Sequence, residues 1–181
     1  MYNEVFIAGS GGQGILSLGR IIVNCAAIED KFATYYPSYG AEVRGGTANC
    51  MLKISDTEIY SPVIENPTEL VVMNTPSYLK FVKKYTPTKY LFLNSSLVEK
   101  NEEIDNYLKN YPLLKVIEVP ATEIANKIGN TLVSNMVMLG GILKVVSMVK
   151  IDTVKKVVED RFNKEIISLN LKALNLGYES V

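Results

Sequence analysis

The chain has 181 residues, of which 48% are hydrophobic and 21% are charged, and its 19 basic and 19 acidic side chains balance. This composition is typical of a soluble globular domain, and the zero net charge argues against a nucleic-acid partner. Because histidine is absent, Ser–His–Asp triads, Cys–His pairs and His-ligated metal sites are excluded. Two cysteines, Cys25 and Cys50, are too few for a four-thiolate iron–sulfur cluster and indicate a reducing compartment, so we expect a cytoplasmic protein.

Neither the N-terminal residues nor the most apolar stretch of the chain suggests a membrane protein. The first residues, MYNEVFIAGSGG, lack the basic start and long apolar stretch of a signal peptide. The most apolar stretch, residues 136–149, is too short for a bilayer and contains Lys144. We therefore expect no signal peptide and no contact with a membrane.

Short apolar runs alternate with helical segments along the chain. Strands are predicted at residues 4–8, 33–36 (ended by Pro37), 47–54, 58–60, 70–73, 90–93 and 116–119. Helices are predicted at residues 13–29, 76–84, 99–110, 121–128, 131–149 and 152 to about 176, the last interrupted near Asn163.

This alternation predicts an α/β fold with three layers, α/β/α, around a mostly parallel central sheet. The sheet is expected to be mixed, because residues 47–54 and 58–60 are separated by a tight turn and predict an antiparallel hairpin. No linker or repeat divides the chain. We expect one domain, residues 1–181, in which residues from about 151 to 181 form a helical C-terminal extension.

A glycine-rich loop follows the first strand and precedes the first helix. Its pattern, G-x-G-x-x-G, lets the backbone approach a phosphate, and the start of the helix attracts an anion. A nicotinamide site would need Asp or Glu at the tip of the second strand, where the chain has Tyr-Tyr-Pro-Ser, and the Gly-Lys-Ser/Thr of a P-loop is missing. The alternative is a tight turn that serves packing alone. The candidate phosphate-binding residues are Ser10, Gly11, Gly12, Gln13 and Gly14.

A second glycine-bearing loop, SYGAEVRGG at residues 38–46, carries Arg44. A guanidinium offers a planar fork of donors to a carboxylate or a phosphate; the alternative is an internal Glu42–Arg44 ion pair that fixes the loop. The nearby Tyr35, Tyr36 and Tyr39 suit a binding face or buried strand ends equally well. The candidate binding residues of this loop are Ser38, Tyr39, Gly40, Glu42, Arg44, Gly45 and Gly46.

Two further features of the sequence concern packing. Gly140 and Gly141 interrupt an apolar helix at a cost of about 1 kcal/mol each relative to alanine, so we expect them to admit another element closely, from the fold or from a partner. Cys25 and Cys50 lie in apolar segments and are expected to be inert core residues.

Three motifs together carry a family resemblance. They are GSGGQGILSLG at residues 9–19, PSYGAEVRGGTAN at 37–49 and NMVMLGGIL at 135–143. In their order and spacing the chain resembles the gamma subunits of 2-oxoacid:ferredoxin oxidoreductases over residues 1 to about 150. The resemblance implies a non-catalytic subunit of an enzyme that converts a 2-oxoacid, coenzyme A and oxidised ferredoxin to acyl-CoA, carbon dioxide and reduced ferredoxin.

The resemblance also implies the partners. Thiamine pyrophosphate, Mg and 4Fe–4S clusters would lie on alpha, beta and delta subunits, ferredoxin would be an indirect partner, and coenzyme A would meet the two glycine loops in the assembled enzyme. No catalytic or metal-binding residue is expected in this chain. The second motif resembles the enzymes for 2-oxoglutarate or branched-chain 2-oxoacids more than those for pyruvate. The alternatives are a Rossmann-like oxidoreductase that binds NAD(P) or flavin, the beta subunit of an indolepyruvate oxidoreductase, and a scaffold whose loops bind nothing.

Overall fold

The computed structural model describes residues 1–39 and 46–181, and these form one six-stranded sheet in the order β2-β3-β1-β4-β5-β6. β1 pairs in parallel with β4, β4 with β5 and β5 with β6, whereas β3 runs antiparallel to both β1 and β2. The prediction of a mixed, mostly parallel sheet is therefore confirmed. The strands are β1 (Tyr2–Ser10), β2 (Phe32–Tyr39), β3 (Thr47–Ser55), β4 (Glu69–Val72), β5 (Tyr90–Asn94) and β6 (Lys115–Val119).

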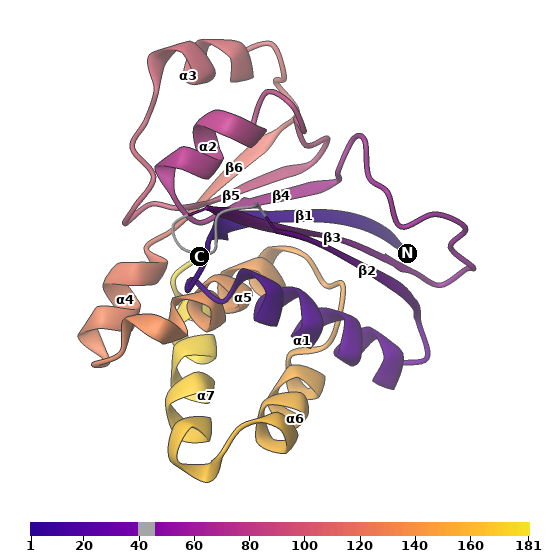
Figure 1. Ribbon diagram of the computed structural model, residues 1–181, viewed down its shortest axis with the longest axis vertical. Coiled ribbons are helices and arrows are strands. Elements are labelled where there is room, and N and C mark those ends of the chain that lie inside the picture. Colours follow the sequence, from indigo (N-terminus) through magenta and orange to yellow (C-terminus); the bar gives the residue numbers. More distant parts are fainter. Residues whose placement is uncertain (40–45) are drawn as a thin grey trace.

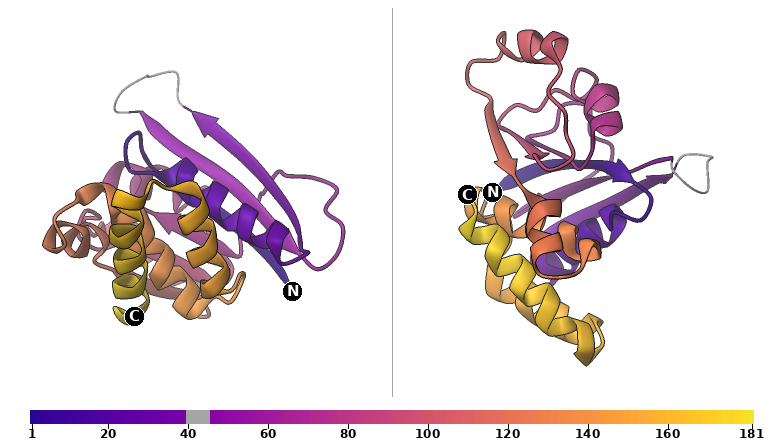
Figure 2. Two further views of the ribbon diagram at one scale, coloured as in Figure 1. Left: turned by 90° about the horizontal axis from the view of Figure 1, so that it is seen from below. Right: turned by 90° about the vertical axis from the view of Figure 1, so that its left-hand side faces the viewer.

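Helices cover the sheet from both sides, so the predicted three layers are present (Figure 1). α2 (Thr75–Phe81) and α3 (Glu102–Leu108) lie on one side. The turned views in Figure 2 place the larger helical layer on the opposite side. Its members are α1 (Ile15–Ile28), α4 (Ala121–Lys127), the short 3₁₀ turn Thr131–Val133, α5 (Ser134–Val145), α6 (Ile151–Arg161) and α7 (Lys164–Glu179).

The alternation of side chains along β1 divides the hydrophobic core into two clusters. Val5 and Ile7 pack with α1 and α5, while Phe6 and Ala8 pack with α2 on the other face. All four side chains are buried. A strand covered on both faces must be apolar along its length, which is the reason for the continuous run at the start of the sequence.

Two details of the predicted strands are wrong. β2 does not end at Pro37 but continues to Tyr39. It is the outermost strand on its side of the described sheet and pairs only with β3, and an edge strand tolerates a proline that lacks an N–H group. The predicted return strand at residues 58–60 is absent, because β3 already pairs with β1 on one side and β2 on the other.

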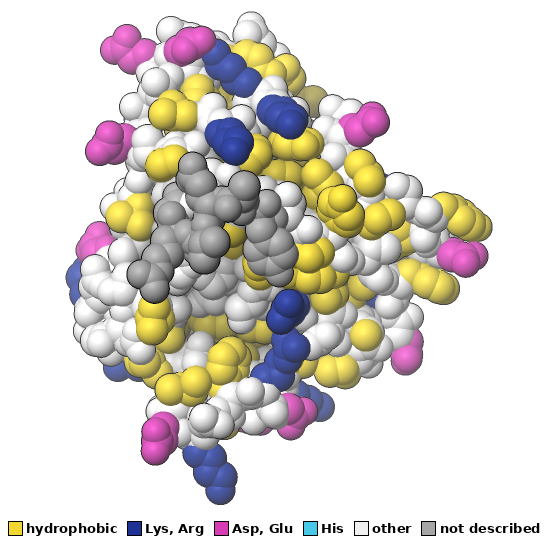
Figure 3. All heavy atoms as spheres, viewed as in Figure 1, with side chains coloured by type: hydrophobic (Ala, Val, Ile, Leu, Met, Phe, Trp, Pro, Cys, Tyr) yellow, Lys and Arg dark blue, Asp and Glu magenta, His cyan; other side chains and the backbone are white. Residues whose placement is uncertain are grey.

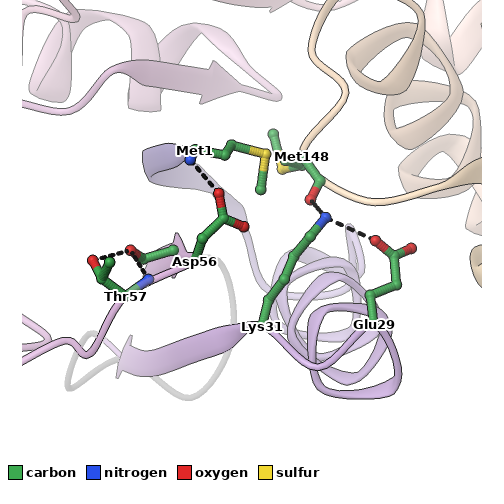
Figure 4. A network of polar contacts seen from close by, with 7 residues as sticks. Met1, Glu29, Lys31, Asp56, Thr57 and Met148 are labelled. Atoms are coloured by element: carbon green, nitrogen blue, oxygen red, sulfur yellow. Dashed lines mark hydrogen bonds and ion pairs between the residues drawn. The ribbon is translucent and has the colours of Figure 1, made fainter.

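A polar network ties the end of α1 to the connection between α5 and α6 (Figure 4). Nζ of Lys31 lies 2.8 Å from the Glu29 carboxylate and donates to the Met148 carbonyl at 2.9 Å. The other Glu29 oxygen accepts the backbone N–H of Lys150 at 2.6 Å. Burial raises the pKa of Glu29, but the hydrogen bonds from Lys31 and Lys150 outweigh it, and the pKa is lowered on balance. In the same view, the N-terminal ammonium of Met1 pairs with Asp56.

The sequence predicts that another element packs closely against Gly140 and Gly141, and that element belongs to the chain's own fold. A Cβ atom at Gly140 would lie 2.1 Å from the carbonyl oxygen of Leu174 in α7, and one at Gly177 would lie 1.9 Å from the carbonyl oxygen of Val137 in α5. Gly141 instead faces the side chain of Val119, at 2.7 Å from its Cβ position. The two glycines that face each other's helix therefore let the backbones of α5 and α7 come into contact.

We predict that Gly140→Ala destabilises the protein by about 1–3 kcal/mol, because the added methyl group meets backbone that cannot move aside. This loss exceeds the gain in helix propensity of about 1 kcal/mol. Gly11→Ala is the matched control, since nothing lies within 4 Å of its Cβ position. Thermal or urea unfolding of the two variants measures the difference. Equal stability of Gly140→Ala and Gly11→Ala would contradict the proposed contact.

Candidate functional site

The first glycine loop lies at the carboxyl edge of the parallel strands. β1 ends at Ser10 and α1 begins at Ile15. β1 lies in the middle of the sheet, next to β4. After β1 the chain continues to β2 and β3 on one side of it, and then crosses to β4 on the other side. Ligands of open α/β sheets bind at this kind of switch point, outside the carboxyl ends of the strands.

The loop contains glycines with different roles. Gly12 has a φ of 91° and Gly14 one of 70°, both in the left-handed region. A Cβ atom on Gly14 would also lie 2.4 Å from Nδ2 of Asn135 in α5, whose amide donates to the Gly14 carbonyl at 3.3 Å. Glycine at position 14 is therefore explained by the tight turn and by its close packing against α5, without a ligand. Gly11 and Gly12 are exposed, with open space around their Cβ positions.

Side-chain amides hold the loop in one shape. The backbone N–H of Ser10 donates to Oε1 of Gln13 at 2.7 Å, and Nε2 of Gln13 donates to the Met73 carbonyl at 3.2 Å. Nδ2 of Asn74 donates to Oγ of Ser10 at 2.6 Å and to Oε1 of Gln13 at 2.9 Å. Oδ1 of Asn74 accepts the N–H of Ser77 and so caps α2. One asparagine thus connects the loop to the next strand and to the start of α2.

The second loop meets the first. The backbone N–H of Gly11 donates to the carbonyl of Gly46 at 3.3 Å, and Nζ of Lys80 in α2 donates to Oγ1 of Thr47 at 3.1 Å. Ser38 is exposed, close to the end of β2, which Tyr39 closes. Of the predicted site residues, Gly40, Glu42, Arg44 and Gly45 lie outside the described residues. Figure 3 shows this face of the molecule, with its described side chains coloured by type.

Unpaired backbone amides collect at the junction of the loops. For the N–H groups of Gly12, Gly14, Ile15 and Leu16, the described residues provide no hydrogen-bond acceptor, and no side chain caps α1. The first turn of α1 also contains no acidic residue. Free N–H groups and the positive end of a helix of 14 residues favour an anion such as a phosphate.

The predicted tyrosine cluster does not form a single face. Tyr35 turns toward α1 and donates its hydroxyl to the Leu16 carbonyl at 3.3 Å. Tyr36 projects from the opposite face of β2 and is 49% exposed. Neighbouring residues of a strand alternate between faces, so at most one of these two rings can face a ligand at the loops.

Three polar side chains at this edge are not among the predicted site residues. Asn74 follows β4, Asn94 ends β5, and Thr122 lies in α4 after β6. Nδ2 of Asn94 donates to the Met73 carbonyl at 3.2 Å and to Oγ1 of Thr122 at 2.9 Å. Asn74 and Asn94 share a signal in the sequence, an asparagine after a buried apolar run on successive strands, whereas Thr122 has none.

The cysteines have no role at this site. Cys25 and Cys50 are free and buried, and burial raises the pKa of each thiol to about 12. Both are protonated at neutral pH, which confirms that they are inert core residues.

Among the described residues no cluster of three or more Cys, Asp or Glu side chains has the geometry to hold a metal ion. Within the same residues, none of the helices combines the length and the apolar character needed to span a membrane.

Comparison with known sequences identifies a protein family that matches nearly the whole chain. Residues 4–180 match the family described as pyruvate ferredoxin/flavodoxin oxidoreductase. The chain is 32% identical over 180 residues to ketoisovalerate oxidoreductase subunit VorA of Methanothermobacter thermautotrophicus, covering 97% of this chain and 36% of the relative. It is 30% identical over 183 residues to 2-oxoglutarate synthase subunit KorC of Methanothermobacter marburgensis, covering 100% of this chain and 97% of the relative. The chain thus spans about a third of the first curated relatives, which it matches over 36% and 35% of their lengths.

Solved structures share the fold. A 2-oxoglutarate:ferredoxin oxidoreductase from Magnetococcus marinus, with 2-oxoglutarate, coenzyme A and succinyl-CoA bound, matches 98% of this chain and 30% of its own, with a TM-score of 0.88 and 22% identity. At that identity the likeness shows the fold alone. The gamma subunit of a keto/oxoacid ferredoxin oxidoreductase from Geobacter sulfurreducens matches 98% of this chain and 97% of its own, with a TM-score of 0.80 and 26% identity. The resemblance drawn from the three motifs is confirmed.

We predict that Asn74→Ala loosens the first glycine loop. The variant loses both the cap of α2 and the hydrogen bonds to Ser10 and Gln13, at a cost of about 1–2 kcal/mol. Amide hydrogen exchange at residues 10–17 should become faster.

Asn101→Ala is the matched control for this variant. Asn101 caps α3 through the N–H of Ile104 and has no hydrogen bond to the glycine loop among the described residues. It should lose similar stability and leave exchange at residues 10–17 unchanged. The role assigned to Asn74 is wrong if both variants speed exchange in the loop equally.

Proposed function

The chain belongs to the pyruvate ferredoxin/flavodoxin oxidoreductase family, and from that membership we propose that it is the gamma subunit of a 2-oxoacid:ferredoxin oxidoreductase. The assembled enzyme would convert a 2-oxoacid, coenzyme A and oxidised ferredoxin to acyl-CoA, carbon dioxide and reduced ferredoxin. The relatives of equal length, which are named as subunits of 2-oxoacid oxidoreductases, support this proposal over the alternatives.

The observation that carries the role of this chain is the junction of the two glycine loops. The loops touch at Gly11 and Gly46. Beside that contact lie the N–H groups of Gly12, Gly14, Ile15 and Leu16, for which the described residues provide no acceptor. Coenzyme A carries a pyrophosphate and a 3′-phosphate, so amide donors at a helix start suit it chemically. In this proposal residues 10–14, together with Ser38 and Gly46, form the described part of a coenzyme A surface. Tyr39, Gly40, Glu42, Arg44 and Gly45 complete it on sequence grounds alone.

The redox groups would belong to the partners. The donor set of the described residues does not fit an iron–sulfur cluster, because both thiols are buried in the core and protonated. We propose that thiamine pyrophosphate with Mg and the 4Fe–4S clusters reside on alpha, beta and delta subunits, and that ferredoxin meets those subunits. Two free buried thiols are also typical of a reducing compartment, so we propose the cytoplasm as the location.

The strand order disfavours the nicotinamide alternative. In the dinucleotide-binding fold the second strand lies beside the first, so a carboxylate at its tip reaches the ribose next to the glycine loop. Here β3 lies between β1 and β2, which moves the tip of β2 away by one more strand spacing of about 4.8 Å. The described end of β2 also offers Pro37 and Ser38 rather than a carboxylate.

We also propose that residues 1–181 are a single gamma-type domain, with a helical C-terminal extension from about residue 151. α6 and α7 form that extension. The contact of Gly140 with the backbone of α7 supports an extension that packs on its own domain.

Reconstitution with alpha, beta and delta subunits tests the proposed role. Gly11→Val adds a side chain where nothing lies within 4 Å, so it should fold and cover the free amides. We predict that the KM for coenzyme A rises about tenfold, as expected for the loss of one charge-assisted hydrogen bond, with kcat unchanged at saturating coenzyme A.

Glu159→Val, an exposed position on α6, is the control and should leave the KM unchanged. Sedimentation of the reconstituted enzyme separates a binding defect from an assembly defect. If the subunits without this chain turned over with the same KM for coenzyme A, the proposed role would be wrong.

A further inference from the structure

A cavity lies at the other edge of the sheet from the glycine loops. Its volume is about 510 Å³, within the range of small-molecule sites. It lies between residues 83–88, which precede β5, and residues 107–114, which precede β6. Because β4, β5 and β6 run in parallel, this is the amino-terminal edge of the sheet. The cavity is therefore separate from the proposed coenzyme A surface.

One wall of the cavity is aromatic and held in place. The ring centroids of Tyr107 and Tyr111 lie 5.2 Å apart with an interplanar angle of 50°, and their hydroxyl oxygens are 2.8 Å apart. The Tyr107 hydroxyl also lies 2.8 Å from Oγ1 of Thr86, which donates to the Val82 carbonyl at 3.1 Å. This chain of hydroxyl groups fixes both rings before any ligand arrives.

The positive charge of the cavity comes from two lysines that line it, Lys83 and Lys84. Lys83 pairs with Glu103 at 2.5 Å. Lys84 lies over the ring of Tyr85 at 5.2 Å and has no ion pair among the described residues. No Asp or Glu is among the described residues that line the cavity. Its local charge is therefore positive, and an anion meets no carboxylate there.

We propose that this cavity binds a small anionic ligand that carries a planar ring, of which a nucleoside monophosphate is the simplest example. The ring stacks on the tyrosine wall, since aromatic faces hold bases of any type. The phosphate pairs with the ammonium group of Lys84, whose charge no carboxylate in the described chain neutralises. The proposal does not depend on the proposed function, because it concerns a different edge of the sheet.

Calorimetric titration of the full chain with AMP tests the proposal, with adenosine and inorganic phosphate as the two half-ligands. Both halves of the cavity contribute, so AMP should bind at least about tenfold more tightly than either half-ligand. Absence of AMP binding at millimolar concentration overturns the proposal. Equal affinity for AMP and phosphate overturns it too, since the ring would then contribute nothing.

Variants place the binding at this cavity. Lys84→Gln removes the cation and Tyr111→Leu removes half of the ring wall; each should weaken AMP binding about tenfold. Lys156→Gln, on the exposed face of α6, is the charge-matched control and should bind normally. Gly11→Val should also bind AMP normally, because it alters only the glycine loops. AMP binding that falls in Gly11→Val but not in Lys84→Gln would assign the nucleotide to the glycine loops and overturn the proposal.

Discussion

The pairing register between β1 and β3 is the constraint on which the candidate site depends. Because the two strands are antiparallel, the last residue of β1, Ser10, lies opposite the first residue of β3, Thr47. Two loops that are far apart in sequence are thereby brought into contact, and the hydrogen bond from Gly11 to Gly46 joins them. The register itself is fixed by burial, since a shift of one residue would move Val5 and Ile7 to the wrong face of the sheet.

The fold could be predicted from the sequence where one physical signal dominates. The apolar run of β1 and the glycines after it predict a buried strand and a turn into α1, and both are present. The pairing of β3 could not be predicted, because the choice among β1, β2 and residues 58–60 depends on contacts between distant segments. For the same reason the sequence indicates the two glycine loops separately. Asn74, which connects the first loop to α2, is marked in the sequence only by its position after a buried apolar run and before a helix, which does not reveal its bonds to Ser10 and Gln13.

The site offers binding groups and little reactive chemistry. Its described polar groups are backbone amides, side-chain amides, the Ser10 hydroxyl and the Lys80 ammonium, and both thiols of the chain are buried and protonated. Such a surface can bind and orient a phosphate-bearing ligand, whereas bond making and electron transfer need groups from elsewhere. This division explains why a chain without histidine is compatible with membership of a redox family. If the site binds coenzyme A as proposed, variants of the site should change the affinity for coenzyme A rather than the chemical step.

The most direct test of the account is amide hydrogen exchange in the assembled enzyme, measured with and without saturating coenzyme A. The N–H groups of Gly12, Gly14, Ile15 and Leu16, which have no acceptor among the described residues, would gain phosphate acceptors, so the account predicts at least about tenfold slower exchange at these residues. Residues 151–161 of α6, which belong to neither proposed site, should be unchanged. Exchange at residues 12–16 that is the same in both conditions would contradict the assignment of the glycine loops to coenzyme A.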